Sequence, residues 1–376
     1  MFPHSTPQRI PARIPLARYN VVLEVTRDSI HVFDHETDQL LKTLAIPNGI
    51  TPTIVSDVTG DGCTIEGEFG RSCTVQVELF ECTQKIDTEA GYLFDIQYDP
   101  TTAGGSYFGY YEWGMFRREE TRIRVTYTQA VDHMNAGLSV SHDERTWIFL
   151  GFVNGDLIAM DVPSPEEDPS PAPDRYLAWQ ASNDQGIHAF ASWAGYLVSG
   201  HHAGFVKVWD PASGTLVQST QVSPLTVRCL APGVDECFAG TGDGHGIAVD
   251  PLTGQVAWDT PLSSEPIVGC NILPGGVTFV DNAHGIYFVS PTTGALQDAL
   301  RSPTGVSSQP VLFKNWGIVG GAGAVMAFQG PAIFEACHPR DELARALCHH
   351  PEGIILGDDA GTLSWWTYPG VTTRMT

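Results

Sequence analysis

Histidines beside aspartates are the residues of this 376-residue chain best suited to acid–base chemistry. An imidazole exchanges a proton near neutral pH, and a neighbouring carboxylate can orient it for that task. The set consists of His201, His202, His245, His284, Asp243 and Asp281. All of them fall in polar hairpins next to short apolar runs, so we expect them on one rim of the fold. Because hairpin tips are polar for structural reasons alone, we interpret the set as turn residues and predict no catalytic residue.

Two cysteine–histidine segments could in principle close around zinc. They are Cys337-His338 and Cys348-His349-His350. Structural zinc sites place ligands two to four residues apart on a tight knuckle, whereas adjacent residues of a strand point to opposite faces. We therefore expect core thiols with histidines on the rim, and no zinc. The cysteines are spread over a long chain, which is typical of reduced cytosolic thiols.

A calcium-type loop starting at Asp57 is the other metal candidate. Loop positions one, three, five, six and twelve hold Asp57, Thr59, Asp61, Gly62 and Glu68. The full loop needs the glycine for its sharp turn and the acid at its twelfth position. Ile65 at the ninth position offers no side-chain oxygen. A β-turn with Asp-Gly at its tip explains the same residues. Both interpretations stay open.

Other sequence patterns for chemistry are absent. The chain contains no Gly-x-Ser-x-Gly elbow, no phosphate-binding Gly-Lys-Ser/Thr loop and no dinucleotide-binding glycine pattern. We therefore predict no cofactor.

The elements that must position these residues recur along the chain. Three turns, Asp210–Gly214, Asp250–Gly254 and Ser290–Gly294, end in glycines 40 residues apart. Proline presets the first angle of each turn and glycine accepts a positive φ, so each turn reverses a strand. A period of this length with four short strands per unit is typical of a β-propeller blade.

The unit can be aligned in seven places by the apolar residue before each turn. These residues are Phe33, Met160, Trp209, Val249, Val289, Phe328 and Thr367. The alignment predicts an all-β chain that forms a single β-propeller of seven blades, with eight as the alternative. No stretch has a sustained helical period, so little helix is expected.

The repeat resembles those of PQQ-like (quinoprotein-type) and WD-repeat β-propellers. Ala248-Val-Asp250-Pro-Leu-Thr-Gly254-Gln-Val-Ala-Trp258 matches the docking motif of quinoprotein-type blades, and Val208-Trp209-Asp210 resembles the end of a WD repeat. The resemblance covers residues 138–376 well and 18–49 less well. It implies that Trp258 packs between neighbouring blades. The expected blade-docking residues are Trp209, Asp210, Asp250, Gly254 and Trp258.

The sequence divides into four consecutive parts, and the last of them contains a distinct loop. We expect a proline-rich arm over 1–17, the propeller over 18–49 and 137–376, and an acidic, proline-rich loop over 163–174. Residues 50–136 lack a clear copy of the unit but alternate like strands, so they are predicted to form a β-rich insertion or a divergent blade.

The net charge of −23 limits the possible partners. Repulsion from phosphates disfavours nucleic acid and anionic membranes as direct ligands. Acidity can serve solubility alone, or it can steer a partner protein with a basic surface. Because neither a secretory signal nor a membrane span is evident, we expect a cytoplasmic protein.

The segment 104–120 is the expected partner-binding surface, since aromatic residues and arginine are enriched at binding hot spots. Its candidates are Tyr107, Phe108, Tyr110, Tyr111, Trp113, Phe116, Arg117 and Arg118. An internal aromatic cluster is the alternative.

The sequence as a whole favours a non-catalytic protein–protein interaction scaffold in a multiprotein complex. A quinone-dependent or hydrolytic propeller enzyme with a site in the central channel is the alternative function.

Overall fold

The computed structural model describes residues 8–16, 19–47, 50–56, 58, 62–67, 71–78, 80–100, 103–119, 122–142, 145–163, 176–329, 332–337 and 343–375. The chain forms two compact units. One is Thr83–Trp365, and the other combines Met1–Cys82 with Trp366–Thr376. Each unit consists of antiparallel β-sheets.

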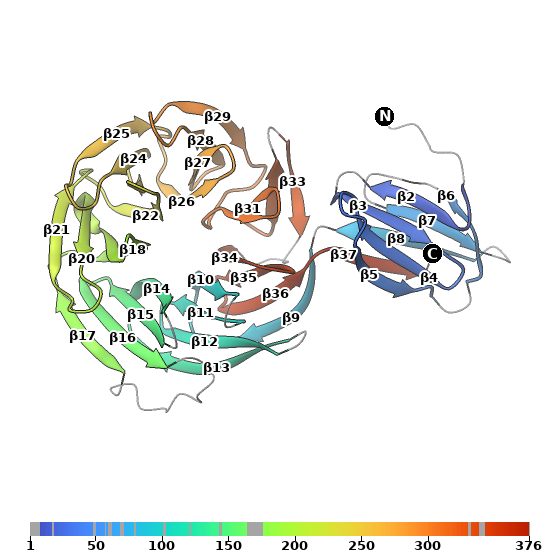
Figure 1. Cartoon of the computed structure of the whole chain (residues 1–376), viewed down its shortest axis with the longest axis horizontal. Coiled ribbons are helices and arrows are strands. Elements are labelled where there is room, and N and C mark those ends of the chain that lie inside the picture. The colour runs from blue at the N-terminus through green and yellow to red at the C-terminus, as the bar shows by residue number, and fades with distance from the viewer. Residues whose placement is uncertain are drawn as a thin grey trace. The chain divides into compact units, whose positions relative to one another are not determined.

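The unit Thr83–Trp365 is a β-propeller, whose seven four-stranded sheets follow one another around a common axis (Figure 1). The first three sheets, innermost strand first, are β10 (Leu93–Asp99), β11 (Gly104–Gly109), β12 (Glu112–Glu119), β13 (Arg122–Ala130); β14 (Met134–His142), β15 (Arg145–Phe152), β16 (Asp156–Pro163), β17 (Leu177–Ser182); β18 (Ile187–Trp193), β19 (Tyr196–His201), β20 (Phe205–Trp209), β21 (Leu216–Gln221). The next two are β22 (Val227–Pro232), β23 (Cys237–Thr241), β24 (His245–Val249), β25 (Val256–Pro261); β26 (Ile267–Leu273), β27 (Gly276–Asp281), β28 (Gly285–Val289), β29 (Leu296–Arg301). The last two are β30 (Val311–Phe313), β31 (Trp316–Gly320), β32 (Val325–Gln329), β33 (Ala332–Cys337); β34 (Ala344–His350), β35 (Gly353–Asp358), β36 (Thr362–Thr367), β9 (Glu81–Asp87).

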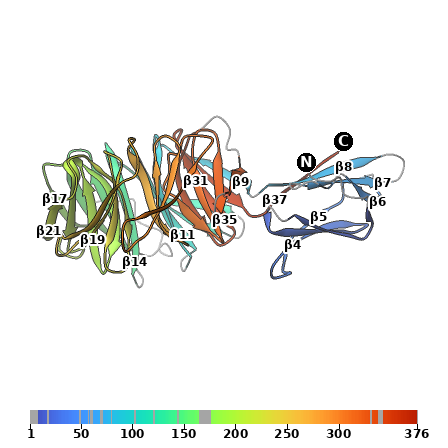
Figure 2. The same ribbon diagram turned by 90° about the horizontal axis from the view of Figure 1, so that it is seen from above.

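Burial within each sheet explains the sequence pattern. The second strands β23, β31 and β35 are buried at every position, because a neighbouring sheet covers each of their faces. They are correspondingly rich in apolar residues and glycine. The outermost strands β21, β25 and β29 are mostly exposed and carry polar residues. The core is thus a series of layers between successive sheets, and the strands run between the two faces of the ring (Figure 2).

The ring closes with a strand from the start of the unit. β9 precedes the first sheet in sequence but pairs with β36 as the outermost strand of the seventh sheet. Thr88 strengthens this closure, because its backbone N–H and its Oγ1 both donate to the carbonyl of Gly361, at 3.0 and 2.7 Å. Segments from the two ends of the unit therefore share one sheet.

The repeated turn is stabilised by its first residue. The Asp250 carboxylate accepts hydrogen bonds from the N–H groups of Leu252 and Thr253, at 2.9 and 3.2 Å. The glycine that ends the turn, Gly254, has a φ of +74°, which glycine adopts without strain. Asp210 and Gly214 are arranged in the same way.

Two tryptophans of outermost strands dock onto the glycine turn of the following sheet. The Nε1–H of Trp258 donates to the Pro291 carbonyl at 2.8 Å, and a Cβ placed on Gly294 would lie 2.7 Å from the Trp258 ring. Trp179 makes the same contact with Pro211 and Gly214. The contact implied by the resemblance for Trp258 is present, and Trp179 repeats it. Between the third and fourth sheets, Gln218 takes the tryptophan's position, and a Cβ placed on Gly254 would meet Gln218 and Thr220.

Trp209, the residue of the Trp-Asp pair, has a different role. Its Nε1–H donates to Ser199 Oγ at 2.7 Å, and this hydroxyl also bonds His201 Nε2 at 2.7 Å. His201 is fully buried. The chain of bonds links neighbouring strands inside the third sheet, so Trp209 stabilises its own blade.

We predict that Gly294→Ala lowers the free energy of unfolding of the propeller by about 2–4 kcal/mol, because the methyl group meets the hydrogen-bonded Trp258 ring and alanine is strained at a φ of +71°. Gly195→Ala is the matched control, since Gly195 has a φ of +83° and no atom within 4 Å of an added Cβ. The control should lose about 1–2 kcal/mol. Equal losses in urea denaturation would show that the tryptophan contact adds no constraint.

The second unit contains two sheets that face each other (Figure 2). Their strands, in spatial order, are β1 (Gln8–Arg9), β6 (Pro52–Ser56), β7 (Gly62–Gly67), β8 (Ser72–Glu78), β37 (Gly370–Met375), and β2 (Ala12–Leu16), β3 (Val21–Val25), β4 (Ser29–Asp34), β5 (Leu40–Ala45). We call this unit the sandwich. It contains strands from both ends of the chain.

The sandwich corrects the prediction that 18–49 is a propeller blade. The Asp34 carboxylate accepts from the N–H groups of Glu36 and Thr37, and Asp38 has a φ of +55°, so this turn copies the one that starts at Asp210. Four antiparallel strands in sequential order also copy a blade. The sequence pattern specifies such a meander but not the sheets against which it packs. The arm expected over 1–17 also differs, since 8–16 supply two strands.

The stretch 50–136 is divided between the units. Its first part supplies β6, β7 and β8 of the sandwich, and its last part, 93–130, forms the complete first sheet of the propeller. In the ring, this sheet takes the place expected for 18–49. The sequence lacked the signal because β12 and β13 are joined without the Asp-to-Gly turn. Most of the expected acidic loop, 164–174, lies outside the described residues.

Candidate functional site

Six innermost strands carry the same irregularity near their start. The pairing with the second strand shifts by one residue at the second position of each strand. The extra residues are Phe94, Asn135, His188, Arg228, Val268 and Arg345. A β-bulge of this kind re-aims a side chain. All six line one cavity, which we call the channel mouth.

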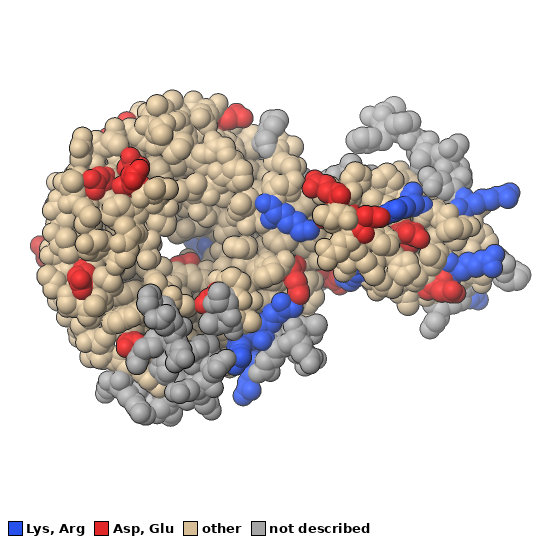
Figure 3. Space-filling view, in the orientation of Figure 1, with Lys and Arg blue, Asp and Glu red and all other residues tan. Residues whose placement is uncertain are grey.

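The channel mouth has a volume of about 210 Å³. The sixth sheet contributes Ser307 and Gln309, from the segment before β30, so all seven blades line it. Figure 3 shows the opening at the centre of the ring, with basic and acidic atoms at its edge and further acidic residues scattered over the visible face. We call the face of the ring at which the innermost strands start the entry face. Turns between the second and third strands also lie on it, because successive strands are antiparallel.

Two arginines give the channel mouth a positive charge. Arg228 and Arg345 are exposed, and no carboxylate of the described residues forms an ion pair with either of them. The Arg345 guanidinium lies 5.9 Å from the centre of the Tyr92 ring, within range of a cation–π contact. Both guanidinium groups are therefore available to a ligand.

His188 is a neutral member of the channel mouth. Burial, helped by nearby Arg228 and His202, lowers its pKa to about 4. The Asn135 amide donates to its Nδ1 at 2.6 Å and to the Ile187 carbonyl at 3.1 Å. The proton of the neutral ring therefore sits on Nε2, which is a hydrogen-bond donor.

Asp95 is the acidic group of the channel mouth. Burial in the channel wall raises its pKa to about 7, although Gln97 Nε2 and the Ile96 N–H donate to it at 2.8 and 2.9 Å. Gln97 in turn accepts from the N–H and Oγ of Ser139 on the next sheet. The carboxyl group is thus partly protonated at neutral pH and is fixed to the wall.

A partly exposed cluster of aromatic rings lies on the entry face beside Arg345. Tyr92 stacks on Tyr110 with ring centres 5.4 Å apart, and Tyr110 contacts the rings of Tyr111 and His133 at 4.8 and 5.2 Å. Tyr111 is 50% exposed. We call these four residues the aromatic rim.

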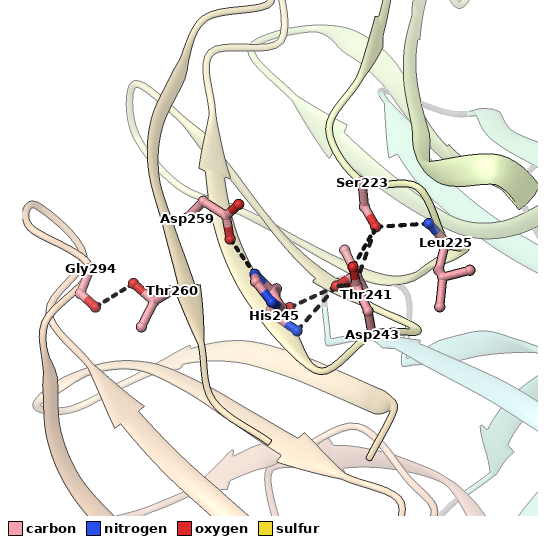
Figure 4. A network of polar contacts seen from close by, with 8 residues as sticks. All are labelled: Ser223, Leu225, Thr241, Asp243, His245, Asp259, Thr260 and Gly294. Carbon is pink, nitrogen blue, oxygen red and sulfur yellow. Dashed lines mark hydrogen bonds and ion pairs between the residues drawn. The ribbon is translucent and has the colours of Figure 1, made fainter. Parts of the chain in front are cut away.

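The histidine–aspartate set of the sequence does not converge on one site. Asp243 accepts from Ser223 and Thr241, whereas His245 pairs with Asp259 on the next strand, with 2.6 Å between Nδ1 and Oδ1 (Figure 4). His284 bonds the carbonyl of Ser302, and His202 bonds Thr226. Burial lowers the pKa of His201 to about 4. Each of these histidines therefore has its own hydrogen-bond partner.

The aromatic segment 104–120 is mainly core, which corrects the expectation of an exposed anchor. Tyr107, Phe108, Trp113 and Phe116 are fully buried. The hairpin β11–β12 is an internal part of a blade, so both of its faces are covered by neighbouring sheets. Tyr110 and Tyr111 belong to the aromatic rim. The two arginines, Arg117 and Arg118, are half-buried, and Arg118 pairs with Glu352 at 2.6 Å.

The metal candidates remain expectations. Asp57, Thr59, Asp61 and Glu68 lie outside the described residues, as does His338. His350 is buried against Trp365, with ring centres 3.7 Å apart. In the part of the chain that the structure describes, no three His, Cys, Asp or Glu side chains are close enough to hold a metal ion.

Sequence reasoning missed the channel mouth, although a signal was present. His188, Arg228 and Val268 are separated by 40 residues, the interval of the turn glycines. Following that interval back from the turns would have shown that these positions point to one axis. It would not have shown the bulge that turns them into the channel.

Comparison with known proteins identifies an architecture. No family model and no curated protein matches the chain. A chain of the solved structure titled "Crystal Structure of Mitotic Checkpoint Complex" is similar, with a TM-score of 0.63 and 10% sequence identity over 76% of this chain and 91% of that chain. Since 1604 chains match, the likeness shows the β-propeller fold shared by many proteins.

The described residues include no helix long and apolar enough to span a membrane.

Proposed function

We propose that this protein is a non-catalytic interaction scaffold that binds partner proteins at the entry face of its propeller. The observation that carries the proposal is the aromatic rim beside the channel mouth. Tyrosine and arginine are the residue types enriched at binding hot spots, and here Tyr92, Tyr110, Tyr111 and Arg345 form one contiguous patch.

Two further observations support a role in a complex. The structural relative with the 0.63 TM-score is part of a protein assembly according to its title. The net charge of −23 suits a partner whose contact surface is basic over most of its area. The fold alone does not decide function, because propellers host many activities.

Affinity purification with quantitative mass spectrometry tests the scaffold proposal. The wild-type chain should retain a reproducible set of proteins, and the double variant Tyr111→Ala/His133→Ala should lose at least one of them. Leu296→Ala is the matched control, since Leu296 is equally exposed but lies on an outermost strand. Retention of the same proteins by the double variant would refute the aromatic rim as the binding surface.

An enzyme with a site in the channel is the second candidate, and Asp95 is the observation that favours it. A carboxyl group with a pKa of about 7 can act as a general acid or base at neutral pH. Hydrolysis of an ester, glycoside or phosphate substrate by the wild type, lost in Asp95→Asn, would establish this function in place of the scaffold.

A further inference from the structure

We propose that the channel mouth binds an oxyanion, a carboxylate or a phosphate monoester, carried by a side chain of the partner protein. Arg228 and Arg345 are the charged ligands and His188 is a neutral donor. The inference rests on the proposed function, because it names the group that the partner inserts.

The placement of the two arginines supports a shared ligand. Arg228 comes from the fourth sheet and Arg345 from the seventh, so they approach the same cavity from separated parts of the ring. A guanidinium offers paired N–H donors that match the oxygens of a carboxylate or phosphate. The cavity of about 210 Å³ is smaller than the roughly 300–1,000 Å³ typical of small-molecule sites. It therefore suits the end of one acidic side chain.

The charge balance of the channel mouth also favours an anion. Two guanidinium groups face one carboxyl group, Asp95, whose hydrogen bonds to Gln97 and Ile96 keep it at the wall. His188 stays neutral and offers Nε2–H, since Asn135 donates to Nδ1. An incoming anion would replace water around the arginines without breaking an ion pair of the described residues.

The acidity of the whole chain does not contradict this inference. At physiological ionic strength, exposed charges more than about 8 Å apart are largely screened from each other. The carboxylates scattered over the outer surface therefore weaken the field at the channel mouth only slightly. They do oppose a polyanion such as nucleic acid, which would have to approach many of them at once.

Calorimetry with defined probes tests the inference on the full-length chain. The probes are inorganic phosphate, a phosphoserine peptide and a glutamate-rich peptide of the same length. We expect the wild type to bind at least one peptide, and Arg228→Gln and Arg345→Gln each to weaken that binding about 10-fold or more. Arg301→Gln, at an exposed position of β29, is the matched control and should bind like the wild type. Thermal denaturation of each variant verifies folding.

The two peptides distinguish the sources of the oxyanion. Tighter binding of the phosphoserine peptide assigns a phosphate monoester, and equal or tighter binding of the glutamate peptide assigns a carboxylate. Binding that is unchanged in the double variant Arg228→Gln/Arg345→Gln overturns the inference. The inference is also overturned if none of the three probes binds at concentrations up to about 1 mM. A dissociation constant of about 1 mM corresponds to a binding free energy of only about −4 kcal/mol.

The pH profile of the glutamate peptide provides a second test. Its carboxylates stay ionised while the Asp95 carboxyl, whose pKa is about 7, becomes protonated as the pH falls. Affinity should therefore rise between about pH 8 and about pH 6, and Asp95→Asn should remove the rise. The other titratable or charged groups around Asp95 are Arg228, Arg345, His188, Tyr92, Tyr98, Cys348 and His349. A rise that persists in Asp95→Asn would refute the assignment to Asp95.

Failure of this inference and failure of the scaffold proposal give different results. If the arginine variants retain the partner proteins and no probe binds, the scaffold remains and the oxyanion pocket is refuted. If the probes bind through the arginines but the aromatic rim variant loses no protein, the pocket remains and the scaffold surface is refuted.

Discussion

Trp113→Ala should lower the free energy of unfolding of the propeller by about 3–5 kcal/mol, the usual loss when a buried aromatic side chain is removed from a core. Trp113 is fully buried, and its ring lies 5.2 Å from that of Tyr127. It packs in a cluster that joins the first two sheets and includes Met134 and Ile148. Urea denaturation followed by circular dichroism measures the loss.

Two companion variants make the Trp113 result specific. Tyr111 lies on the same hairpin but is 50% exposed. The free energy of unfolding of the Tyr111→Ala variant should therefore stay within about 0.5 kcal/mol of the wild-type value. Trp113→Phe should lose less than Trp113→Ala, because the indole Nε1–H is buried without a hydrogen-bond partner among the described residues. A stable Trp113→Ala variant that no longer binds its partner would restore the segment as an interaction anchor.

Asp281→Ala should cost about 3–5 kcal/mol, because the Asp281 carboxylate is buried and accepts five hydrogen bonds. The donors are the N–H groups of Ala283, His284 and Gly285, Ser263 Oγ and Tyr287 OH, at 2.7–3.0 Å. Ser263 belongs to the connection from the fourth sheet, so the loss also loosens the junction between two blades. Asp281→Asn, which keeps an acceptor oxygen, should cost less.

The pH dependence of the Asp281 variant has a definite sign. Burial alone would raise the pKa of Asp281, but the hydrogen bonds from Gly285, Ser263 and Tyr287 hold it below its ordinary value. A carboxyl group with a lowered folded-state pKa stabilises the fold above its unfolded-state pKa, and this contribution is lost as the pH falls through the folded-state value. The stability difference between Asp281→Ala and the wild type should therefore shrink in acid. A difference that is constant from neutral pH to about pH 3 would contradict the role of the charge.

The sequence predicts the repeated unit well and its environment poorly. The Asp-to-Gly turns and the apolar second strands are local signals, and they predicted the all-β propeller. The turn from Asp34 to Asp38 gives the same local signal in a different unit, since a four-stranded meander has the same chemistry in either place. The sheet over 93–130 gave no such signal because β12 and β13 are joined without that turn, and its core consists of buried aromatic residues.

The channel mouth illustrates a second limit of sequence reasoning. Arg228 and Arg345 lie far apart in the chain, and they share a cavity because a bulge occurs at the same place in different sheets. The period locates the positions, but the bulge depends on strand pairing. In the segment 104–120, by contrast, residue type alone could not distinguish a core cluster from an exposed anchor.

Closure of the ring by β9 couples the stability of the propeller to that of the sandwich. The entire propeller lies in sequence between β8 and β37, which pair with each other in the sandwich. If that intervening segment were disordered, joining its ends would cost about 5 kcal/mol of chain entropy. Once β9 pairs with β36, the two connections leave the ring from adjacent strands, and most of that entropy has already been lost. The two pairings therefore support each other: formation of either one brings the chain ends of the other together, and unfolding of the ring leaves the β8–β37 pairing to bear the full entropy cost of closing the loop.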